Sequence, residues 1–411
     1  MAHPFTPTSP SLPFYVYNVG IKPRRLFHSR VRYTYKHHEL KSRKTTNQLA
    51  TTMIKNSPQE WPEPIVRVQS LSKIYKDSIP ERFIKPPSDR ASIITSSDYD
   101  ANVPIIDLGG LNGDPDTIAS TLGQISEACH DWGFFQVVNH GVSHDLMDMA
   151  RETWRQFFHS PIEVKEQYAN SPNTYEGYGS RLGVKKDAIL DWSDYYYLHY
   201  LPLSLKDYNK WPHVPPSCRE VIDEYGRELA KLCRKLLKVL SINLGLEEGI
   251  LENAFGGEDI GACLRVNFYP KCPKPDLALG LSSHSDPGGM TLLLPDEQVA
   301  GLQVRKNNNW ITVKPAPHAF IVNIGDQIQV LSNAIYKSVE HRVIVNSNKE
   351  RVSLAFFYNP KSDIPIKPAK ELVKPDRPAL YTAMTFDQYR LFIRIKGPCG
   401  KSHMESLKSP T

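Results

Sequence analysis

Apolar residues recur every three or four positions in two long stretches of the first 255 residues. In residues 117–132 they fall at Ile118, Leu122, Ile125 and Cys129. In residues 219–244 they fall at Ile222, Tyr225, Leu229, Leu232, Leu236 and Leu240. This spacing places apolar side chains on one face of a helix. Both stretches are therefore predicted to be long amphipathic helices that bury this face.

From residue 263 onward the apolar period shortens towards two, which is typical of strands. Turn-forming stretches such as Asp286-Pro-Gly-Gly289 and Asn307-Asn308-Asn309 separate the apolar segments. Short strands joined by turns favour a double-stranded β-helix, a jelly-roll core of the α+β class with a helical shell. The predicted strands are 264–268, 290–294, 301–304, 319–324, 337–345 and 351–358, and a last helix is predicted over about 384–396.

Charge is unevenly distributed along the 411 residues. Residues 1–50 hold nine Lys/Arg and one acid, a net charge of +8, whereas the remaining chain holds 41 basic and 43 acidic residues, a net charge of −2. The body of the protein is therefore not a basic nucleic-acid binder. We expect a basic, disordered tail over 1–60, a largely helical region over 61–255, the β core with its last helix over 256–400, and a short tail over 401–411.

The basic tail has two interpretations. It is poor in acids and has no apolar stretch of signal-peptide length, so it could direct the chain to plastids. It could equally be an upstream extension of the reading frame, because Met53 opens a segment that runs into Trp61. We favour the extension and a cytoplasmic location. No membrane span is expected, and six cysteines without a Cys-x-x-Cys pair favour reduced thiols.

Three residues with metal-binding side chains stand within residues 281–358, and their spacing makes sense if this region forms strands of one barrel. His284 and Asp286 are two positions apart, so they point to the same side of an extended chain. His341 lies in another stretch rich in β-branched residues. Two imidazoles and one carboxylate on one face of a metal leave the opposite face open. That arrangement suits Fe(II), which must hold a cosubstrate and O2 together.

A possible dicarboxylate site follows on the last predicted strand. Arg351, Ser353 and Phe357 occupy odd positions and therefore share one face of that strand. A guanidinium binds a carboxylate through two parallel hydrogen bonds, and a hydroxyl adds a third. Arg351 and Ser353 can thus grip the distal end of a dicarboxylate, and Phe357 can wall an apolar pocket beside it.

These residues, together with three further motifs, resemble the plant soluble Fe(II)/2-oxoglutarate-dependent dioxygenases. The motifs are Asn267-Phe-Tyr-Pro-Lys-Cys272, Val103-Pro-Ile-Ile-Asp-Leu108 and Trp132-Gly-Phe-Phe-Gln-Val-Val-Asn-His-Gly141. The resemblance covers residues 100 to 400, and it implies Fe(II), 2-oxoglutarate and O2, with ascorbate in support. No catalytic residue is expected beyond the iron centre.

The resemblance also implies roles for individual residues. His284, Asp286 and His341 would bind iron. Arg351 and Ser353 would bind the distal carboxylate of 2-oxoglutarate, assisted by Tyr269 with Asn267 nearby. Tyr269 could instead be a core tyrosine with a satisfied hydroxyl. Asn139 and His140, in contrast, are interpreted as scaffold in a turn that joins a strand to a helix.

Arginines and aromatic residues suggest where a substrate would bind. Arg265 lies on an otherwise apolar strand, where an unpaired cation is costly, so it needs an anionic partner. Phe386, Arg390 and Arg394 recur every four residues on the last predicted helix and share one face. The two helix arginines could alternatively lie in solvent, where they would favour the helix dipole. If they instead face the site, the arginines and Phe386 together fit a small acid with a hydrophobic body.

Five longer stretches closely resemble the plant jasmonate-induced oxygenases, also called jasmonic acid oxidases. They are Trp61-Pro-Glu-Pro-Ile-Val-Arg-Val-Gln-Ser-Leu71, Phe83-Ile-Lys-Pro-Pro87, Tyr175-Glu-Gly-Tyr-Gly-Ser-Arg-Leu-Gly183, Asp191-Trp-Ser-Asp-Tyr-Tyr-Tyr-Leu198 and Thr385-Phe-Asp-Gln-Tyr-Arg-Leu-Phe392. The resemblance implies hydroxylation of jasmonic acid to 12-hydroxyjasmonic acid, which lowers active jasmonate and jasmonate-dependent defence signalling.

Two other functions remain open at this point. A flavonoid-oxidising dioxygenase of the anthocyanidin or flavonol synthase type would share the iron and 2-oxoglutarate motifs, but a neutral polyphenol does not call for an arginine cluster. A non-catalytic hormone-binding or metal-storage β-barrel protein would not need all three metal ligands together with Arg351 and Ser353. The expected partner is a small carboxylic acid, with no nucleic acid and no membrane.

Overall fold

The computed structural model describes residues 61–90, 103–172, 174–181, 185–396, 400–405 and 407–408. Residues Ser57–Thr411 form one structural unit. The predictions for the basic tail concern residues 1–60, which lie outside the described ranges, and the side chain of Arg394 lies outside them as well.

The core of the unit consists of two β-sheets with a cavity between them. The larger sheet has eight strands in the order β1-β2-β10-β7-β12-β5-β4-β3, and the smaller has four in the order β6-β11-β8-β9. The strands are β1 (Ile105–Asp107), β2 (Phe134–Val138), β3 (Gly177–Gly179), β4 (Asp194–Leu201), β5 (Gly261–Tyr269), β6 (Leu281–His284), β7 (Met290–Leu294), β8 (Leu302–Lys306), β9 (Asn309–Thr312), β10 (Phe320–Ile324), β11 (His341–Val343), β12 (Arg351–Asn359), β13 (Pro365–Ile366) and β14 (Met384–Thr385).

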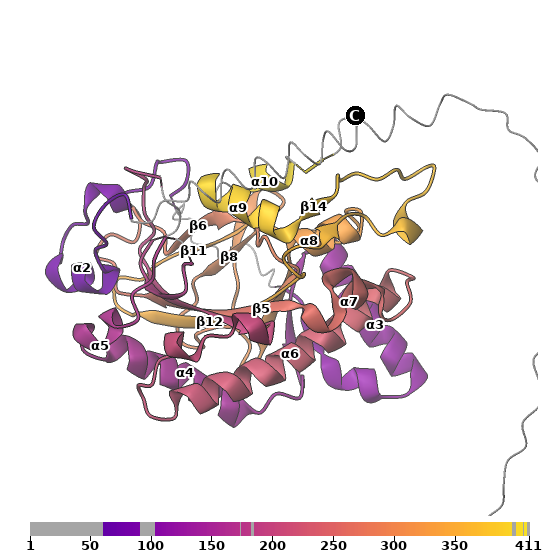
Figure 1. The fold of residues 1–411 in the computed structure, drawn as a ribbon, viewed down its shortest axis with the longest axis horizontal. Helices are drawn as coiled ribbons and strands as arrows, with labels where there is room; N and C mark the ends of the chain where they lie inside the picture. The colour runs from indigo at the N-terminus through magenta and orange to yellow at the C-terminus, as the bar shows by residue number, and fades with distance from the viewer. Residues whose placement is uncertain are drawn as a thin grey trace, which may run out of the picture. The chain divides into compact units, whose positions relative to one another are not determined.

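Helices lie on both sides of this core. Figure 1 shows α4 and α6 on one side of the large sheet and α9 and α10 on the opposite side of the molecule. The helices are α2 (Val68–Ile74), α3 (Pro115–Asp131), α4 (His144–His159), α5 (Ile162–Glu166), α6 (Cys218–Asn243), α7 (Ile250–Phe255), α8 (Asp326–Leu331), α9 (Phe386–Lys396) and α10 (Ser402–Glu405). The two long helices predicted from apolar spacing are α3 and α6, with ends that differ by one or two residues.

The pleat of strand β12 separates the core from the cavity. Its even-numbered residues Val352, Leu354, Phe356 and Tyr358 belong to the main hydrophobic cluster. Its odd-numbered residues Arg351, Ser353, Ala355 and Phe357 line the cavity. Side chains alternate between the two faces of a strand, so the shared face predicted for Arg351, Ser353 and Phe357 is confirmed.

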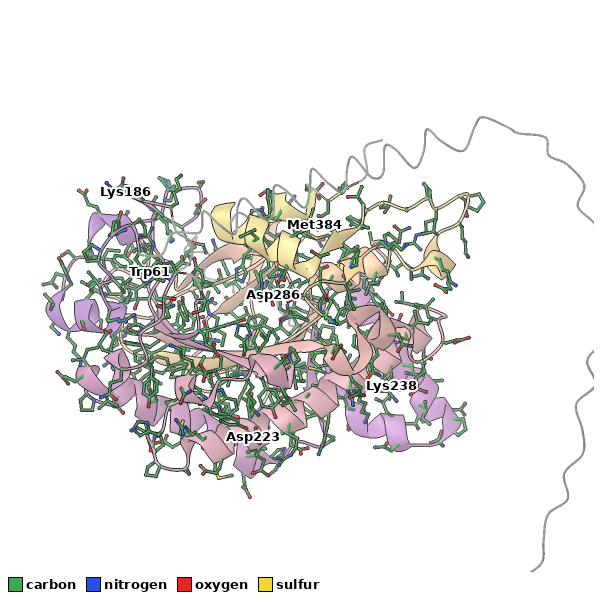
Figure 2. All side chains as sticks on the ribbon, in the orientation of Figure 1. Trp61, Lys186, Asp223, Lys238, Asp286 and Met384 are labelled. Carbon is green, nitrogen blue, oxygen red and sulfur yellow. The ribbon has the colours of Figure 1, made fainter. Side chains whose placement is uncertain are left out.

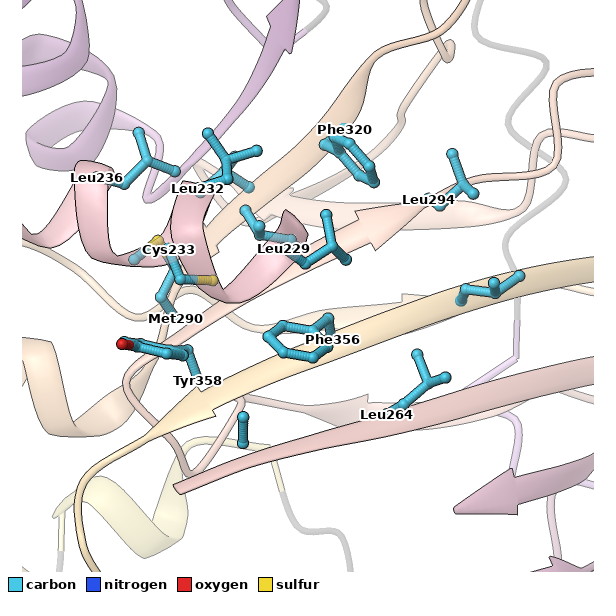
Figure 3. Packing of buried hydrophobic residues seen from close by; sticks show 14 of the residues in the cluster. Leu229, Leu232, Cys233, Leu236, Leu264, Met290, Leu294, Phe320, Phe356 and Tyr358 are labelled. Carbon is cyan, nitrogen blue, oxygen red and sulfur yellow. The ribbon is translucent and has the colours of Figure 1, made fainter. Parts of the chain in front are cut away.

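Helix α6 packs on the apolar face of the large sheet. Figure 3 shows Leu229, Leu232 and Leu236 of the helix turned towards strand residues that include Phe320 and Phe356. Complete burial of each such side chain stabilises the fold by about 1.5–3 kcal/mol. This packing holds the sheet, and it thereby positions the residues on the cavity face.

Several elements were not predicted, or were predicted with different lengths. The strand predicted over 337–345 is reduced to β11, His341–Val343. The first two residues of the predicted last helix form β14, so α9 begins at Phe386. Helix α8 gave no amphipathic signal because all six of its residues are buried. Strand β4 gave no alternation because it is aromatic on both faces: Tyr196 lies in the core and Tyr195 and Tyr197 line the cavity.

Two properties expected from composition can be compared with the structure. Within the described residues, no helix is both long and apolar enough to cross a membrane. Five of the six cysteines lie in the described ranges, and all five are buried and free: Cys129, Cys218, Cys233, Cys263 and Cys272.

Candidate active site

Three potential metal ligands converge at one point of the cavity wall. His284 ends β6, His341 begins β11, and these two residues are paired across the small sheet. The Nε2 atom of His284 lies 3.6 Å from Asp286 Oδ1, and that of His341 lies 3.7 Å from the same oxygen. Figure 2 shows Asp286 near the middle of the molecule. Residues predicted from two distant segments are thus brought together within reach of one ion.

Backbone carbonyls orient both imidazoles. His284 Nδ1 lies 2.8 Å from the carbonyl oxygen of Ser282, and His341 Nδ1 lies 3.1 Å from that of Val339. A carbonyl oxygen can only accept, so each Nδ1 carries the proton. Each Nε2 therefore faces Asp286 and is the ring nitrogen left to bind a metal.

Asp286 is held so that one of its two oxygens stays available. Its Oδ2 accepts hydrogen bonds from Thr291 Oγ1 at 2.6 Å and from Asn323 Nδ2 at 2.8 Å. Its Oδ1 is the atom that faces the two histidines. The site therefore offers two imidazole nitrogens and one carboxylate oxygen, the donor set that suits an open Fe(II) centre.

Local electrostatics favour the metal-binding forms of Asp286 and His341, whereas at His284 burial lowers the pKa but the hydrogen bond and charge of Asp286 outweigh it and raise the pKa. Burial opposes ionisation of Asp286, but His341, His284 and Thr291 outweigh it and hold the pKa of Asp286 well below its usual range. Burial and the neighbouring His284 lower the pKa of His341 to about 4. At neutral pH Asp286 is therefore ionised and His341 is neutral, and these are the forms that ligate a metal.

Arg351 and Ser353 form the second part of the site. Both are almost completely buried, with exposed fractions of 3% and 1%. Arg351 donates from Nη1 to Ser353 Oγ at 3.1 Å and from Nε to the carbonyl oxygen of Val299 at 3.2 Å. No carboxylate forms an ion pair with this guanidinium in the described part of the chain. A buried cation without an anion fits the distal carboxylate of a dicarboxylate ligand.

Tyr269 and Asn267 lie opposite this pair on the neighbouring strand. Tyr269 is aligned with Arg351 and Asn267 with Ser353. The Arg351 guanidinium lies 5.1 Å from the centre of the Tyr269 ring. Both β5 residues line the cavity. Asn267 has a further contact that the sequence did not reveal, since its Oδ1 accepts from Arg265 Nε at 2.7 Å.

Arg265 lines the same cavity. Its guanidinium lies 4.2 Å from the centre of the Tyr195 ring. Within the described ranges it forms no ion pair with a carboxylate, and its hydrogen-bond partner is the neutral amide of Asn267. The structure thus supplies a ring and an amide but not the anionic partner that the sequence argument required.

Helix α9 contributes residues to the wall of the same cavity. Phe386, which is 4% exposed, and Arg390 both line the cavity, as do Phe357 and Ile393. The side chain of Arg390 is 45% exposed and pairs with Asp387 at 3.0 Å. Arg390 therefore combines the two interpretations made from the sequence, because it borders the cavity and also lies partly in solvent.

The cavity has a volume of about 600 Å³ and includes walls that the sequence argument missed. Tyr195, Tyr197 and His199 project into it from alternate positions of β4. Phe134 on β2 packs edge-on against His341, with ring centres 5.3 Å apart. The alternation of positions 195, 197 and 199 could have indicated that these residues share a face. It was not recognised because the strand carries aromatic residues on both faces.

Asn139 and His140 lie in the turn between β2 and α4. Asn139 has a φ of 50° and donates to Asp107 Oδ2 at 2.8 Å. His140 contacts the carbonyl oxygen of His318 through Nε2 at 3.0 Å and accepts from the backbone N–H of Val142. These contacts agree with the interpretation of both residues as scaffold.

Comparison with known proteins places this geometry in a family. A model of the 2OG-Fe(II) oxygenase superfamily matches residues 260–360, and a model of the non-haem dioxygenase N-terminal region in morphine synthesis matches residues 103–214. Jasmonate-induced oxygenase 2 of Arabidopsis thaliana is 68% identical over 359 residues, which are 87% of this chain and 96% of that protein. The chain belongs to the 2OG-Fe(II) oxygenase superfamily. This oxygenase is most usefully compared with the jasmonate-induced members.

A solved relative confirms the fold and the cofactors. The crystal structure of JOX2 in complex with 2OG, Fe and JA matches this chain with a TM-score of 0.80 and 68% sequence identity. The match covers 85% of this chain and 100% of the JOX2 chain. The predicted jelly-roll core with a helical shell is confirmed, and so is the prediction of a dioxygenase that uses Fe(II) and 2-oxoglutarate.

The alternatives are less well supported. Flavonol synthase 1 of Crocosmia x crocosmiiflora is 38% identical, over 79% of this chain and 97% of that protein. This is well below the identity with the jasmonate-induced oxygenase, so the comparisons favour the jasmonate interpretation over the flavonoid one. Membership of an oxygenase family, with all three ligands in place, also argues against a non-catalytic binding protein.

Proposed function

We propose that this oxygenase hydroxylates jasmonic acid at the far end of its pentenyl chain and so produces 12-hydroxyjasmonic acid. The observation that carries the proposal is Arg265, a guanidinium in the cavity wall without a carboxylate partner in the described residues. Such a cation calls for an anionic ligand, and the relative solved with JA is 68% identical. This activity would lower active jasmonate and jasmonate-dependent defence signalling.

The candidate metal site fits Fe(II) because of its donor atoms and because these atoms face one point. His284, Asp286 and His341 would hold the ion through two Nε2 atoms and one Oδ1. When bound, Fe(II) together with 2-oxoglutarate and O2 supplies the oxidation that converts a C–H bond into C–OH, with release of succinate and CO2. The protein itself needs no acid or base at the attacked carbon. Ascorbate is expected to support turnover.

The other side chains would bind and orient the two acids. Arg351 and Ser353 would hold the distal carboxylate of 2-oxoglutarate, with Tyr269 and Asn267 beside them. Arg265 would hold the carboxylate of jasmonic acid, because it lines the cavity and its guanidinium is already fixed at Nε by Asn267 and on one face by the Tyr195 ring.

The remaining contacts of the substrate would come from the cavity wall and the last helix. Arg390 and Arg394 would add positive charge near the carboxylate, and Phe357 and Phe386 would shape an apolar channel for the body of the molecule. A carboxylate fixed at one end presents the opposite alkyl end to the metal. Catalysis would then depend on positioning.

Product analysis tests this proposal. The full chain is incubated in air with Fe(II), 2-oxoglutarate and either jasmonic acid or a dihydroflavonol, and the products are identified by mass spectrometry. We expect jasmonic acid to gain one oxygen atom, located at carbon 12 by fragmentation, with one succinate formed per product. Faster oxidation of the dihydroflavonol would favour the flavonoid alternative.

For cellular location we propose the cytoplasm. The support is the composition of the tail, which is interpreted as an extension ahead of Met53. Fluorescent fusions of the full chain and of a chain that starts at Met53 should both be cytoplasmic in plant cells. Accumulation of the full-chain fusion alone in plastids would show that the tail is a transit peptide.

A further inference from the structure

We propose that Lys85 and Asp191 are positioning residues for the iron ligand His284, and that they act through Ser282. This inference rests on the iron site of the proposed function but not on the identity of the substrate. Lys85 follows the short helical turn Glu81–Phe83, and Asp191 precedes β4. Neither residue lines the cavity.

A continuous chain of contacts leads from the ion pair to the imidazole. Lys85 Nζ lies 2.8 Å from Asp191 Oδ1 and 2.9 Å from Ser282 Oγ. The same Asp191 oxygen accepts from the backbone N–H of Ser282 at 3.0 Å and from its hydroxyl at 2.6 Å. The carbonyl oxygen of Ser282 then accepts the Nδ1 proton of His284 at 2.8 Å. Asp191 thus fixes Ser282 through its N–H and hydroxyl, and the carbonyl of the same residue sets the orientation of the ligand.

Burial makes this arrangement rigid. The side chains of Lys85 and Asp191 are only 3% and 13% exposed. Backbone hydrogen bonds hold both segments against the loop before β6, since Lys85 N–H donates to Leu277 and Trp192 N–H donates to Leu279. Breaking a buried ion pair by removing one partner is costly, so Asp191 has no alternative position within easy reach.

The second histidine ligand lacks a comparable support. His341 Nδ1 also contacts a carbonyl oxygen two residues earlier, that of Val339, at 3.1 Å. In the described residues, however, no ion pair contacts Val339. The support for His284 comes from two distant segments, since Asp191 lies 91 positions and Lys85 197 positions from Ser282. A change at Asp191 should act on metal binding through this one ligand.

Two substitutions at Asp191 separate positioning from folding. Asp191→Asn and Asp191→Ala both leave Lys85 without an anion, so both should destabilise the fold. Asn keeps an Oδ1 acceptor for Ser282, and the ammonium of Lys85 favours that oxygen over the amide NH2. The affinity for Fe(II) should therefore fall about tenfold in Asp191→Ala, in line with losses seen for groups behind metal ligands, and less than threefold in Asp191→Asn.

The readout is the Fe(II) dissociation constant of the full-chain protein. It is measured without oxygen at saturating 2-oxoglutarate, well below the unfolding temperature, from the visible absorbance of the complex. Unfolding by urea is measured on the same samples. Glu166→Ala is the matched control, because it removes the acid paired with the buried Arg67 at 2.7 Å, far from the iron site in the sequence and outside the cavity wall.

A charge-neutral double variant covers the case in which Asp191→Ala does not fold. Lys85→Met combined with Asp191→Leu removes both charges and replaces each side chain by an apolar one of similar length, so it should fold and still show the tenfold loss of Fe(II) affinity. The proposal is overturned if the folded variant that lacks the acceptor binds Fe(II) within twofold of the unmodified protein. It is also overturned if Asp191→Asn, or the Glu166→Ala control, loses as much affinity as Asp191→Ala.

Discussion

Two groups of residues in the cavity wall are constructed differently, although the hydrogen bond from Arg265 to Asn267 joins them. At the proposed iron and 2-oxoglutarate end, Asp286, His341 and Arg351 are at most 7% exposed, and each is fixed by hydrogen bonds within the protein. At the substrate end, Arg265 rests on a tyrosine ring and Arg390 projects from a helix with 45% of its side chain exposed.

This difference separates chemistry from recognition. The iron and 2-oxoglutarate end is preorganised by paired strands, so it should tolerate little change. The substrate end combines one strand residue with a helix near the end of the chain. Changes there should alter which acid is bound and how tightly, while the iron site stays intact.

Loss of a metal ligand should have the largest effect. In His284→Ala, Asp286→Ala or His341→Ala, the two remaining ligands cannot hold the open facial geometry. We expect turnover to fall by at least about 100-fold, the upper end of the loss seen even when only the groups behind ligands are changed. Succinate formation and bound iron would be measured for each variant. Near-normal turnover in any of the three would contradict the assignment.

Arg351→Ala should raise the KM for 2-oxoglutarate. A charge-assisted hydrogen bond contributes about 1.5–3 kcal/mol, so the increase should be about 10- to 100-fold. Arg351→Lys keeps the charge but cannot form two parallel hydrogen bonds. Its KM for 2-oxoglutarate should therefore lie between the values of the unmodified enzyme and of Arg351→Ala. Initial rates at varied 2-oxoglutarate and saturating jasmonic acid provide the test. If only the KM for jasmonic acid changed, Arg351 would bind the substrate and not 2-oxoglutarate, and the assignment would be wrong.

Substitutions at the substrate end should have graded effects. Arg265→Ala should weaken the use of jasmonic acid about tenfold or more, because a desolvated carboxylate loses its partner. Arg390→Ala should have a smaller effect, up to about fivefold, because exposed pairs contribute only about 0.2–1 kcal/mol. The KM for 2-oxoglutarate should hardly change in either variant. If both variants lost the same activity towards jasmonic acid, the exposure of the two arginines would not determine how much each contributes to binding.

His199 should produce the smallest effect, one on stability in acid. Burial, and then Arg390, lower the pKa of His199 to about 4, whereas an unfolded histidine titrates near about 6.5. Because the unfolded chain takes up the proton first, this group destabilises the fold as the pH falls from 6.5 towards 4. His199→Asn should therefore lose less stability between pH 7 and pH 5, by on the order of 1 kcal/mol. The free energy of unfolding is measured with urea at both pH values for the variant and the unmodified protein. An identical loss of stability in the two proteins between pH 7 and pH 5 would contradict the prediction.

Residue spacing predicted part of the geometry of the candidate site for a physical reason. Arg351 and Ser353 are two positions apart on β12, and the strand pleat places them on one face. His284 and Asp286 have the same spacing, but β6 ends at His284, so Asp286 follows the strand. The long helices α3 and α6 were predictable because they are apolar on one face only. These features are local along the chain, so a single sequence reveals them.

Other features depend on contacts between distant segments. Asp191 and Lys85 are 106 positions apart, and no local pattern marks their pairing. Tyr197 and His199 belong to a strand that is aromatic on both faces, so its cavity face could not be recognised. The partner of Asn267 became clear only when the fold placed Arg265 beside it.

The most direct test of the account compares jasmonic acid with its methyl ester on the unmodified enzyme. The central claim is that a guanidinium at the substrate end binds a carboxylate while the alkyl end faces the metal. The ester keeps the alkyl end but loses the charge, so its kcat/KM should be lower by about tenfold or more, with the same KM for 2-oxoglutarate. Equal kcat/KM values for the acid and the ester would contradict the claim.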